Sequence, residues 1–544
     1  MPAWLAVLLA RRGVATPDEA RRFLAPSLDQ LHDPYLLAGM EQAVGRLLAA
    51  RERGERIAVV GDYDVDGITA TAQLLAIFQA CGLDARPILP HRLREGYGFQ
   101  PVHVEKAVEA SCRLIVTADC GSSSAEAVQA AQDHGVDVVV TDHHLPGCEL
   151  PAGVSHINPR QPGCGYPFRD LAAAGLALKL ALALAGRCQR TVDPAAFLRI
   201  ACLGTIADLV PLLGENRVIA ALGLQALEQA RSHGLKALIQ QSGMKPPFTA
   251  TDVGFRLGPR INAAGRLDNP DQALELLMSR DPRRAVELAA ELDRWNRERQ
   301  AEEGRVVEEA RERILQRAPL PSILVEWDET WHKGVVGVAA GRIAKEFHRP
   351  TLLLAVEGET ATGSGRSIPG VDLHGFLSPW KERLERFGGH TQAVGMTARV
   401  ERLPELSGEW EAAAAGAWHA DLLVPRLEYE LHLPARGISH ALLADLGRLE
   451  PFGQGNPKPL LRVGPLRVDG PPRYFGNGHL AARARGEDGG TVELVGWGWR
   501  EKEGRLAGSI EVLACLEYDS YRGEPVLRLV DSRPATPAHE PTGN

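Results

Sequence analysis

Three aspartates alternate in one short segment, Asp62-Tyr63-Asp64-Val65-Asp66-Gly67, which directly follows an apolar, strand-like run at residues 57–60. Carboxylate oxygens are the ligands that hard divalent cations prefer in proteins. Acids gathered where a strand ends can surround such a cation. The segment therefore predicts a metal site, and the chain is expected to be a metalloenzyme.

A calcium-binding EF-hand loop is the alternative interpretation, because Asp62, Asp64, Asp66 and Gly67 fall at its positions one, three, five and six. Position twelve of that loop needs a bidentate glutamate, and here it is Gln73. The acids also follow a strand-like run, whereas an EF-hand has a helix on each side. Both differences disfavour the calcium loop.

Three further segments bring an acid or a histidine to an apolar, strand-like run. They are residues 114–118 before Asp119, residues 138–141 before Asp142, His143 and His144, and residues 203–210 around Asp208. Strands separated by helical patterns predict a parallel α/β sheet, and ligands of such sheets bind at the carboxyl ends of the strands. All four segments are therefore expected to converge on one site.

The mixture of carboxylates and imidazoles narrows the choice of metal. It suits manganese, or magnesium with more water, better than zinc held by thiolates. It also favours two ions bridged by a shared aspartate, which together stabilise a phosphoryl oxygen and activate water near neutral pH. The expected cofactors are two divalent ions, Mn²⁺ or Mg²⁺, and the expected reaction is phosphoester hydrolysis.

The ordered set of motifs resembles a known superfamily. The DHH phosphoesterases have four motifs that match Asp64-Val65-Asp66-Gly67, Asp119, Asp142-His143-His144 and Asp208 in this order. Four further segments are similar to the RecJ family within that superfamily: residues 90–98, 258–267, 331–337 and 450–457. The resemblance covers nearly the whole chain and implies an exonuclease that degrades single-stranded DNA from its 5′ end, releasing 5′-mononucleotides.

The resemblance also implies roles for the acids and histidines. It makes five side chains metal ligands: Asp64, Asp66, Asp119, His143 and Asp208. Asp62 is either a further ligand or an acceptor that supports a ligand, and Asp142 is expected to orient the neighbouring imidazoles. His144 either binds metal or contacts the scissile phosphate. For Asp62 and Asp142 an ordinary helix or turn cap remains an alternative.

Substrate contacts are implied in the same way. Arg92, Ser364 and Arg366 are expected to bind the 5′-terminal phosphate, with residues 363–367 forming a small glycine-rich loop that lets backbone amides approach an anion. An ordinary glycine turn is the alternative for that segment. His390, in a Gly-Gly-His segment, is expected near the substrate, and Asn262 and Arg266 are further candidate contacts.

Length and composition fit a multidomain globular protein. The chain has 544 residues, 44% of them hydrophobic, and eight cysteines without a Cys-x-x-Cys pair. Reduced thiols in a soluble cytoplasmic protein are therefore expected, with no membrane segment. The net charge of −8 disfavours a generic nucleic-acid binder, so any basic DNA track must be local.

The expected fold class is α/β: a parallel-sheet DHH domain, a long connecting helix, a smaller α/β domain of the DHHA1 type and a carboxyl-terminal all-β OB-fold. Short β-rich runs separated by Gly and Pro turns indicate the OB-fold, with residues 473–479 and 497–499 as candidate base-stacking segments. The expected boundaries are an amino-terminal segment at 1–40, the DHH domain at 41–270, the helix at 271–317, the DHHA1 domain at 318–422, the OB-fold at 423–532 and a disordered tail at 533–544.

Single-stranded DNA is the expected partner, with a single-strand-binding protein and a helicase as candidate protein partners and the chain itself a monomer. Two alternatives remain. One is a phosphodiesterase of short oligonucleotides or cyclic dinucleotides, whose relatives generally lack the barrel and the long helix. The other is a noncatalytic DNA-binding scaffold, which would have no need of a costly cluster of negative charge.

Overall fold

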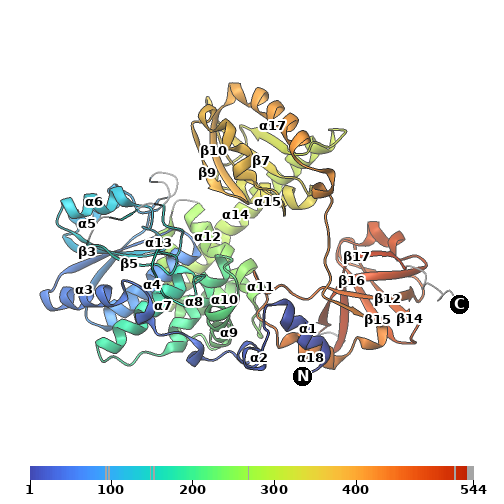
Figure 1. The fold of residues 1–544 in the computed structure, drawn as a ribbon, viewed down its shortest axis with the longest axis horizontal. Coiled ribbons are helices and arrows are strands. Elements are labelled where there is room, and N and C mark those ends of the chain that lie inside the picture. Colours follow the sequence, from blue (N-terminus) through green and yellow to red (C-terminus); the bar gives the residue numbers. More distant parts are fainter. Residues whose placement is uncertain are drawn as a thin grey trace. The chain divides into compact units, whose positions relative to one another are not determined.

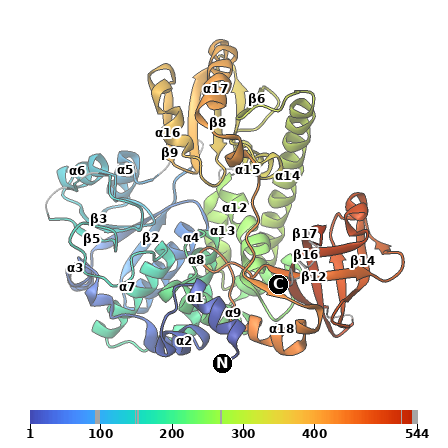
Figure 2. The ribbon, with the colours of Figure 1, turned by 45° about the vertical axis from the view of Figure 1, so that its right-hand side comes forward.

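The computed structural model describes residues 1–91, 95, 98–147, 149–150, 153–266, 269–519 and 522–535, without the side chain of Arg266. The chain divides into two compact units (Figures 1 and 2). The first contains Met1–Gly265, Pro270–Leu288 and Glu428–Asn544, and the second contains Arg266–Asn269 and Ala289–Leu427.

The first unit is built on a five-stranded parallel sheet in the order β2-β1-β3-β4-β5. Apolar residues fill its central strands because both faces are covered. The strands are β1 (Arg56–Gly61), β2 (Asp84–Ile88), β3 (Cys112–Ala118), β4 (Asp137–Thr141) and β5 (Ser155–Ile157). This order confirms the parallel sheet predicted from the sequence.

Helices cover both faces of the sheet, with α5 and α6 on one face and α3, α4 and α7 on the other (Figure 1). The first unit contains α1 (Ala3–Arg11), α2 (Pro17–Leu24), α3 (Met40–Arg53), α4 (Val65–Ala80), α5 (Pro101–Glu109), α6 (Ala125–Asp133), α7 (Ala173–Arg187), α8 (Pro194–Ala207), α9 (Gly214–Glu228), α10 (His233–Ser242), α11 (Ala250–Asp252), α12 (Gly258–Arg266) and α13 (Pro270–Met278). Shorter turns are η1 (Leu28–Gln30), η2 (Pro34–Leu36) and η3 (Val253–Leu257).

The strand-like interpretation of residues 203–210 was wrong. Leu203 to Ala207 form the last turns of α8, and Asp208 is the residue that ends this helix. Helix α8 packs against α4, α7 and α9 and is apolar on nearly all sides over its second half. A short apolar run in a fully buried helix has the same composition as a buried strand, so periodicity cannot separate them.

The second unit contains a mixed five-stranded sheet in the order β6-β7-β8-β10-β9, in which only β6 and β7 are parallel. Its strands are β6 (Leu324–Asp328), β7 (Thr351–Glu357), β8 (Thr360–Arg366), β9 (Arg386–His390) and β10 (Ala393–Arg399). Its helices are α15 (Val336–Phe347), α16 (Leu373–Leu377) and α17 (Leu403–Ala417), with the turns η4 (Ser378–Arg383), η5 (Val400–Arg402) and η6 (Ala420–Leu423). The long helix α14 (Pro282–Leu315) joins the two units in sequence. The connecting helix was expected at 271–317, but the start of that range is occupied by the separate helix α13, so the long helix begins later than expected.

The glycine-rich segment at residues 363–367 was predicted to be a loop, but residues 363–366 lie within strand β8. The glycine there has a packing role, because a Cβ on Gly363 would lie 2.1 Å from the Leu353 carbonyl oxygen on the neighbouring strand. A glycine inside a strand marks such a close backbone approach. Ser364 and Arg366 are therefore held on a rigid sheet.

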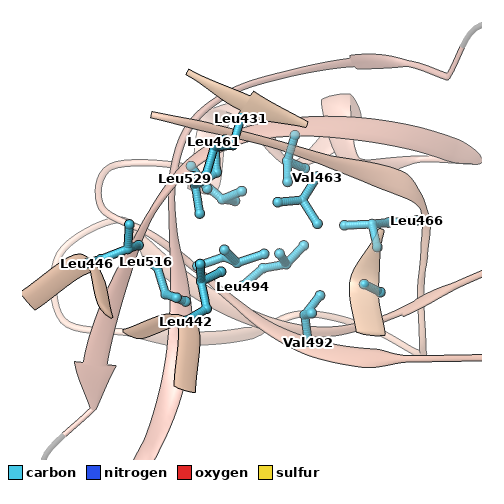
Figure 3. Close-up of a cluster of buried hydrophobic side chains, with 14 of the residues drawn as sticks. Leu431, Leu442, Leu446, Leu461, Val463, Leu466, Val492, Leu494, Leu516 and Leu529 are labelled. Carbon is cyan, nitrogen blue, oxygen red and sulfur yellow. The ribbon is translucent and has the colours of Figure 1, made fainter. Parts of the chain in front are cut away.

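A seven-stranded sheet in the order β11-β12-β16-β17-β15-β14-β13 forms the carboxyl-terminal domain, and an extra β12–β14 pairing closes it into a barrel. Leucine and valine side chains fill its interior (Figure 3). Its elements are β11 (Leu431–Leu433), β12 (Leu461–Val468), β13 (Arg473–Phe475), β14 (His479–Gly486), β15 (Thr491–Gly496), β16 (Ser509–Asp519), β17 (Glu524–Pro534), α18 (His440–Gly447), η7 (Ala435–Gly437) and η8 (Arg500–Leu506). The predicted all-β barrel is confirmed.

Three details of the first unit differ from or add to the expectations. The amino-terminal helices α1 and α2 share a buried core with the barrel, through residues such as Leu5 and Phe23. Strand β13 lies in a segment that was expected only to supply aromatic rings. Strand β17 continues to Pro534, and the Ala535 amide donates to the Ser509 carbonyl at 2.8 Å, so the first residues of the expected tail are ordered; residues 536–544 lie outside the described residues. Among the described helices, none is long and apolar enough to cross a membrane.

Candidate metal centre

Three aspartates stand one residue beyond the ends of neighbouring parallel strands. The amide of Asp62 donates to the Ala118 carbonyl at 3.1 Å, that of Asp119 to Thr141 and that of Asp142 to Ile157, so each continues the ladder of its sheet. Asp119 has a φ of 69°, a left-handed conformation that is uncommon outside glycine and recurs at functional sites. The carboxyl edge of the sheet thus gathers acids from β1, β3 and β4.

Helix α4 brings two further acids to this edge. Asp64 caps the helix, since its Oδ1 accepts a hydrogen bond from the Gly67 amide at 3.0 Å. Asp66 is buried in the first turn and accepts hydrogen bonds from the amides of Ala173 (2.7 Å) and Ala174 (2.8 Å) at the start of α7. The helix follows a strand directly, which confirms that the aspartates do not lie in an EF-hand.

The structure brings together seven of the side chains selected from the sequence. They form three overlapping groups whose potential ligand atoms lie within 4.8 Å of one another: Asp62 with Asp64 and Asp119, Asp66 with His143 and Asp208, and Asp119 with His143 and His144. The His143 Nε2 atom lies 3.1 Å from Asp119 Oδ1, 3.7 Å from Asp208 Oδ2 and 3.8 Å from Asp66 Oδ2. Because Asp119 and His143 each belong to two groups, the arrangement could hold neighbouring cations.

Buried polar atoms that make no hydrogen bond indicate that these residues fit a cation. Asp119 Oδ1 and both ring nitrogens of His143 are buried and have no hydrogen-bond partner within the described part of the chain. Buried polar atoms of this kind are costly unless something compensates them. Their oxygens and imidazole nitrogens are ligand types that suit Mn²⁺ and, with more water, Mg²⁺.

The pKa shifts of the clustered side chains also indicate a cation site. Burial, together with the charges of Asp208 and Asp64, raises the pKa of Asp66 well above its ordinary value. Burial and the neighbouring aspartates raise the pKa of Asp119 in the same direction. Burial and Asp64 raise the pKa of Asp208 to about 7, and burial lowers the pKa of His143 to about 3. Positive charge at the centre would favour the ionised carboxylates.

Asp142 holds the neighbouring residues of the cluster through hydrogen bonds. Its Oδ2 accepts from the Ser122 amide at 2.9 Å, and its Oδ1 accepts from the His143 amide and from Nδ1 of His144, the latter at 2.8 Å. Burial acts to raise the pKa of Asp142, but these hydrogen bonds outweigh it and keep that pKa well below its usual range. Burial alone would lower the pKa of His144, but its bond to Asp142 raises that pKa to about 9. Asp142 therefore caps a turn and orients an imidazole at the same time.

The remaining candidate residues lie in different places. Asn262 is next to α4, where its Oδ1 accepts a hydrogen bond from the Val65 amide at 3.1 Å. Ser364, Arg366 and His390 belong to the mixed sheet of the second unit. Arg92 and the side chain of Arg266 lie outside the described residues.

Comparisons with known proteins agree with this architecture. The profile of the DHH family, N-terminal domain, matches residues 56–205, that of the DHHA1 domain matches 320–415 and that of the RecJ OB domain matches 429–530. The single-stranded-DNA-specific exonuclease RecJ of Bacillus subtilis is 37% identical over 97% of this chain and 67% of its own length. The corresponding protein of Salmonella typhimurium is 34% identical over 97% of this chain and 95% of its own.

The chain belongs to the RecJ family. A crystal structure of RecJ from Thermus thermophilus in complex with Mn²⁺ superposes with a TM-score of 0.83 at 32% identity, covering 98% of this chain and 76% of that one. The same protein has also been crystallised in complex with Mg²⁺, and that structure superposes with a TM-score of 0.78. The RecJ fold therefore extends over nearly the whole chain.

Sequence reasoning missed the residues that support the RecJ-type centre from β5. Asn158 donates to the Ser122 hydroxyl and to the His144 carbonyl, each at 2.8 Å, and Ser122 Oγ lies 2.9 Å from His156 Nε2. A signal for them was present, because Asn158 directly follows the short strand β5 as the aspartates follow β1, β3 and β4. The three-residue length of β5 concealed it.

Proposed function

We propose that this chain is a metal-dependent exonuclease that degrades single-stranded DNA from its 5′ end and releases 5′-mononucleotides, in DNA repair and recombination. The observation that carries this proposal is the convergence of seven acid and histidine side chains at the carboxyl edge of the parallel sheet, in a chain of the RecJ family. Single-stranded DNA is the substrate that the names of the relatives state.

The metal ligands in this proposal are Asp62, Asp64, Asp66, Asp119, His143 and Asp208. Two divalent cations held there, Mn²⁺ or Mg²⁺, would supply Lewis-acid stabilisation of the phosphodiester and activation of water. The protein fixes the geometry of the ligands in advance. Asp66 is held by two amides of α7, and Asp119 by a left-handed backbone at a strand end.

His144 is proposed to act on the scissile phosphate. Its Nδ1 lies 2.8 Å from Asp142 Oδ1, and this hydrogen bond raises the pKa of His144 to about 9, which favours the protonated ring. A protonated imidazole beside the metal ligands can donate a hydrogen bond to a phosphate oxygen or a proton to the leaving 3′ oxygen. Asp142 serves this role indirectly by fixing the tautomer and orientation of the ring.

The mixed sheet of the second unit supports the proposed recognition of the 5′-terminal phosphate. In its register, Arg366 on β8 is opposite Ala393 on β10, which in turn is opposite His390 on β9. Directly opposed residues of antiparallel strands point to the same face of a sheet. Ser364, two residues before Arg366, shares that face because side chains alternate along a strand. Three of the predicted substrate contacts thus lie on one surface.

Two features of this surface suit an anion: open space beside two glycines, and a nearby helix N-terminus. Ser364 is opposite Gly395, which is opposite Gly388, and a Cβ at either glycine would meet no atom within 4 Å. At its other side a Cβ on Gly337 would lie 3.1 Å from the Ser364 hydroxyl and 3.3 Å from Arg366 Nη2. Gly337 is in the first turn of α15, so amides of a helix N-terminus reach the same place. A 5′-phosphate bound here would set the polarity of degradation.

The barrel is proposed to hold the rest of the DNA strand. Trp497 is 57% exposed and its ring lies 4.7 Å from that of His479 and 5.7 Å from that of Phe475. Tyr474 is 44% exposed, and the Arg500 guanidinium lies 5.2 Å from its ring. Exposed aromatic rings beside cations bind single strands by base stacking. Trp499, the other predicted stacking residue, is buried in the barrel core.

The proposal extends to the cellular setting. We place a monomeric enzyme in the cytoplasm, where its seven described cysteines are free thiols suited to a reducing compartment. A helicase that exposes single strands and a single-strand-binding protein that coats them are the proposed protein partners. Size-exclusion chromatography with light scattering tests the monomer, and pull-down with each purified partner tests the complexes.

A doubly labelled substrate tests the activity. One single-stranded oligonucleotide is labelled at its 5′ end and, in a separate preparation, at its 3′ end, then incubated with Mn²⁺, Mg²⁺ or a chelator. We expect labelled mononucleotide to appear at once from the 5′ end, gradual shortening of the 3′-labelled strand and no reaction in chelator. Cleavage of dinucleotides alone would instead identify a small-substrate phosphodiesterase, and binding without cleavage a scaffold.

A further inference from the structure

The segment that follows Asp208 is under backbone strain. Leu209 has a φ of 59°, a left-handed conformation that is unfavourable for a leucine. Its side chain is 71% exposed, so its own packing does little to hold the backbone there. Strained residues of this kind persist only where the surrounding structure fixes them. Leu209 directly follows the residue that ends α8, a position where a left-handed residue often stops a helix but is usually glycine. A contact that fixes the chain here would therefore also fix Asp208.

A loop of the carboxyl-terminal domain makes that contact. The Leu212 amide donates a hydrogen bond of 2.7 Å to the carbonyl oxygen of Gln454. Gly453 lies so close that a Cβ there would be 2.6 Å from Leu212 Cδ1, and a Cβ on Gly455 would be 3.1 Å from Pro211 Cβ. Leu212 is buried. The glycines therefore allow the loop at residues 453–456 to lie directly against the segment that carries Asp208.

The 453–456 loop is itself fixed from within. Gly453 and Asn456 exchange backbone hydrogen bonds of 2.9 and 3.1 Å. The buried side-chain amide of Asn456 donates to the carbonyls of Leu449 (2.8 Å) and Pro451 (2.9 Å), and its Oδ1 accepts from Arg12 at 2.6 Å. Satisfied buried polar networks of this kind are rigid.

Helix α9 holds both sides of the contact. The Asn216 side chain donates to the Pro211 carbonyl at 3.1 Å, and Arg217 donates to the carbonyls of Leu449 (2.8 Å) and Glu450 (2.7 Å). Both side chains are buried. Neighbouring residues of one helix thus bind the segment after Asp208 and the loop that lies against it.

We propose that the 453–456 loop is a positioning element of the metal centre: it fixes residues 209–213 and thereby holds Asp208 where a cation needs it. The inference rests on the proposed function, because it assumes that Asp208 is a metal ligand. It assigns a role to residues 450–457, which neither the metal cluster nor the phosphate-binding surface uses. It also makes metal affinity depend on a loop of the DNA-binding domain.

The test is Gly453→Ala in the full-length protein, with Mn²⁺ binding measured by calorimetry in the absence of DNA. Gly453 has no left-handed backbone, so the added methyl acts only by displacing Leu212. Mutations of residues that orient metal ligands weaken metal affinity by about 10- to 100-fold, and we expect the displacement of Leu212 to cost affinity in this range. Gly447→Ala is the matched control, because a Cβ there meets no atom within 4 Å, and its Mn²⁺ affinity should equal that of the parent.

A double-mutant cycle with Leu212→Ala separates positioning from general damage. In Gly453→Ala/Leu212→Ala the atoms that the new methyl would meet are gone, and the nearest remaining Leu212 atom, Cβ, lies 4.0 Å away. We expect Gly453→Ala to cost little further affinity in the Leu212→Ala background, although it costs much in the parent. If Gly453→Ala alone does not fold, Leu212→Ala carries the test: it removes the side chain that packs against the loop, so it should bind Mn²⁺ more weakly than the parent, and equal affinity would refute the positioning role.

The outcomes separate the two proposals. If the parent binds no Mn²⁺, the metal-dependent function and this inference both fail. If the parent binds Mn²⁺ and folded Gly453→Ala binds it equally well, the function stands and the positioning role is refuted. Equal losses from Gly453→Ala in both backgrounds would likewise refute the Leu212 contact as the route.

Discussion

Replacing Asp208 with asparagine should stabilise the metal-free protein at alkaline pH while weakening its response to metal. Burial and Asp64 raise the pKa of Asp208 from 3.8 to about 7 in the folded state. An acid with a raised folded-state pKa stabilises the fold most at low pH, and that stabilisation is lost as the pH rises toward the folded-state value. For these two pKa values, the carboxyl costs about 3 kcal/mol of folding stability between pH 5 and pH 8.

Urea unfolding in a chelator at several pH values measures this effect. The difference in unfolding free energy between Asp208→Asn and the parent should grow in favour of the variant by about 3 kcal/mol from pH 5 to pH 8. Adding Mn²⁺ at about 100 times its dissociation constant should restore about 3 kcal/mol to the parent and less to the variant. A difference that is independent of pH, or a parent that gains nothing from Mn²⁺ at pH 8, would refute the reasoning.

Three further variants test separate parts of the proposal. Asp119→Ala should abolish hydrolysis but leave the fold and DNA binding intact, and an active variant would remove the shared-ligand assignment. Arg366→Ala should slow degradation of 5′-phosphorylated strands more than of 5′-hydroxyl strands; equal losses, or the same preference in the control Arg399→Ala at the far end of β10, would relocate the phosphate site. Trp497→Ala should weaken binding of long single strands by about 1–3 kcal/mol without affecting cleavage of dinucleotides. Tyr518 is also exposed, and the control Tyr518→Ala should leave both strand binding and dinucleotide cleavage unchanged.

The carboxyl edge of the parallel sheet was predictable from the sequence because its elements are short and sharply patterned. The apolar runs that end at Asp62, Asp119 and Asp142 are separated by helical patterns, and strands connected in this way are parallel. Parallel strands place their carboxyl ends at the same edge of the sheet. The structure brings these residues to one edge. The ligand types and the order of the motifs then indicated the chemistry without any knowledge of distances.

For Asp208 the sequence predicted the location but not the secondary structure that positions it. Its predicted location near the other acids agrees with the structure, although the strand inferred for it is a helix. An apolar run buried on all sides carries no period that separates the two. The contacts that hold Asp208, between Leu212 and Gln454, join residues more than two hundred positions apart through backbone atoms. Backbone contacts of that range leave no signature in side-chain pattern.

The structural role of glycine was the hardest to predict, because glycine occurs both in turns and where two backbones pack closely. Gly363 was taken as part of a loop, yet it lies in a strand where any side chain would meet Leu353. Gly204, within α8, is similar: a Cβ there would lie 2.5 Å from Asp66 Oδ1 and 2.4 Å from Thr69 Oγ1. Helix α8 can pass this close to Asp66 and Thr69 of α4 only because it lacks a side chain at that point.

The same close approach explains why the centre depends on metal. Glycines and strand ends bring acids from α4, from β1 and β3 and from the end of α8 into a space where burial and mutual repulsion raise the pKa of Asp66, Asp119 and Asp208. Such a cluster is stable only when it is protonated or when cations neutralise it. At neutral pH protonation is incomplete at Asp208, so bound cations would complete both the fold of this edge and the catalytic site. Function and local stability therefore rest on the same ions.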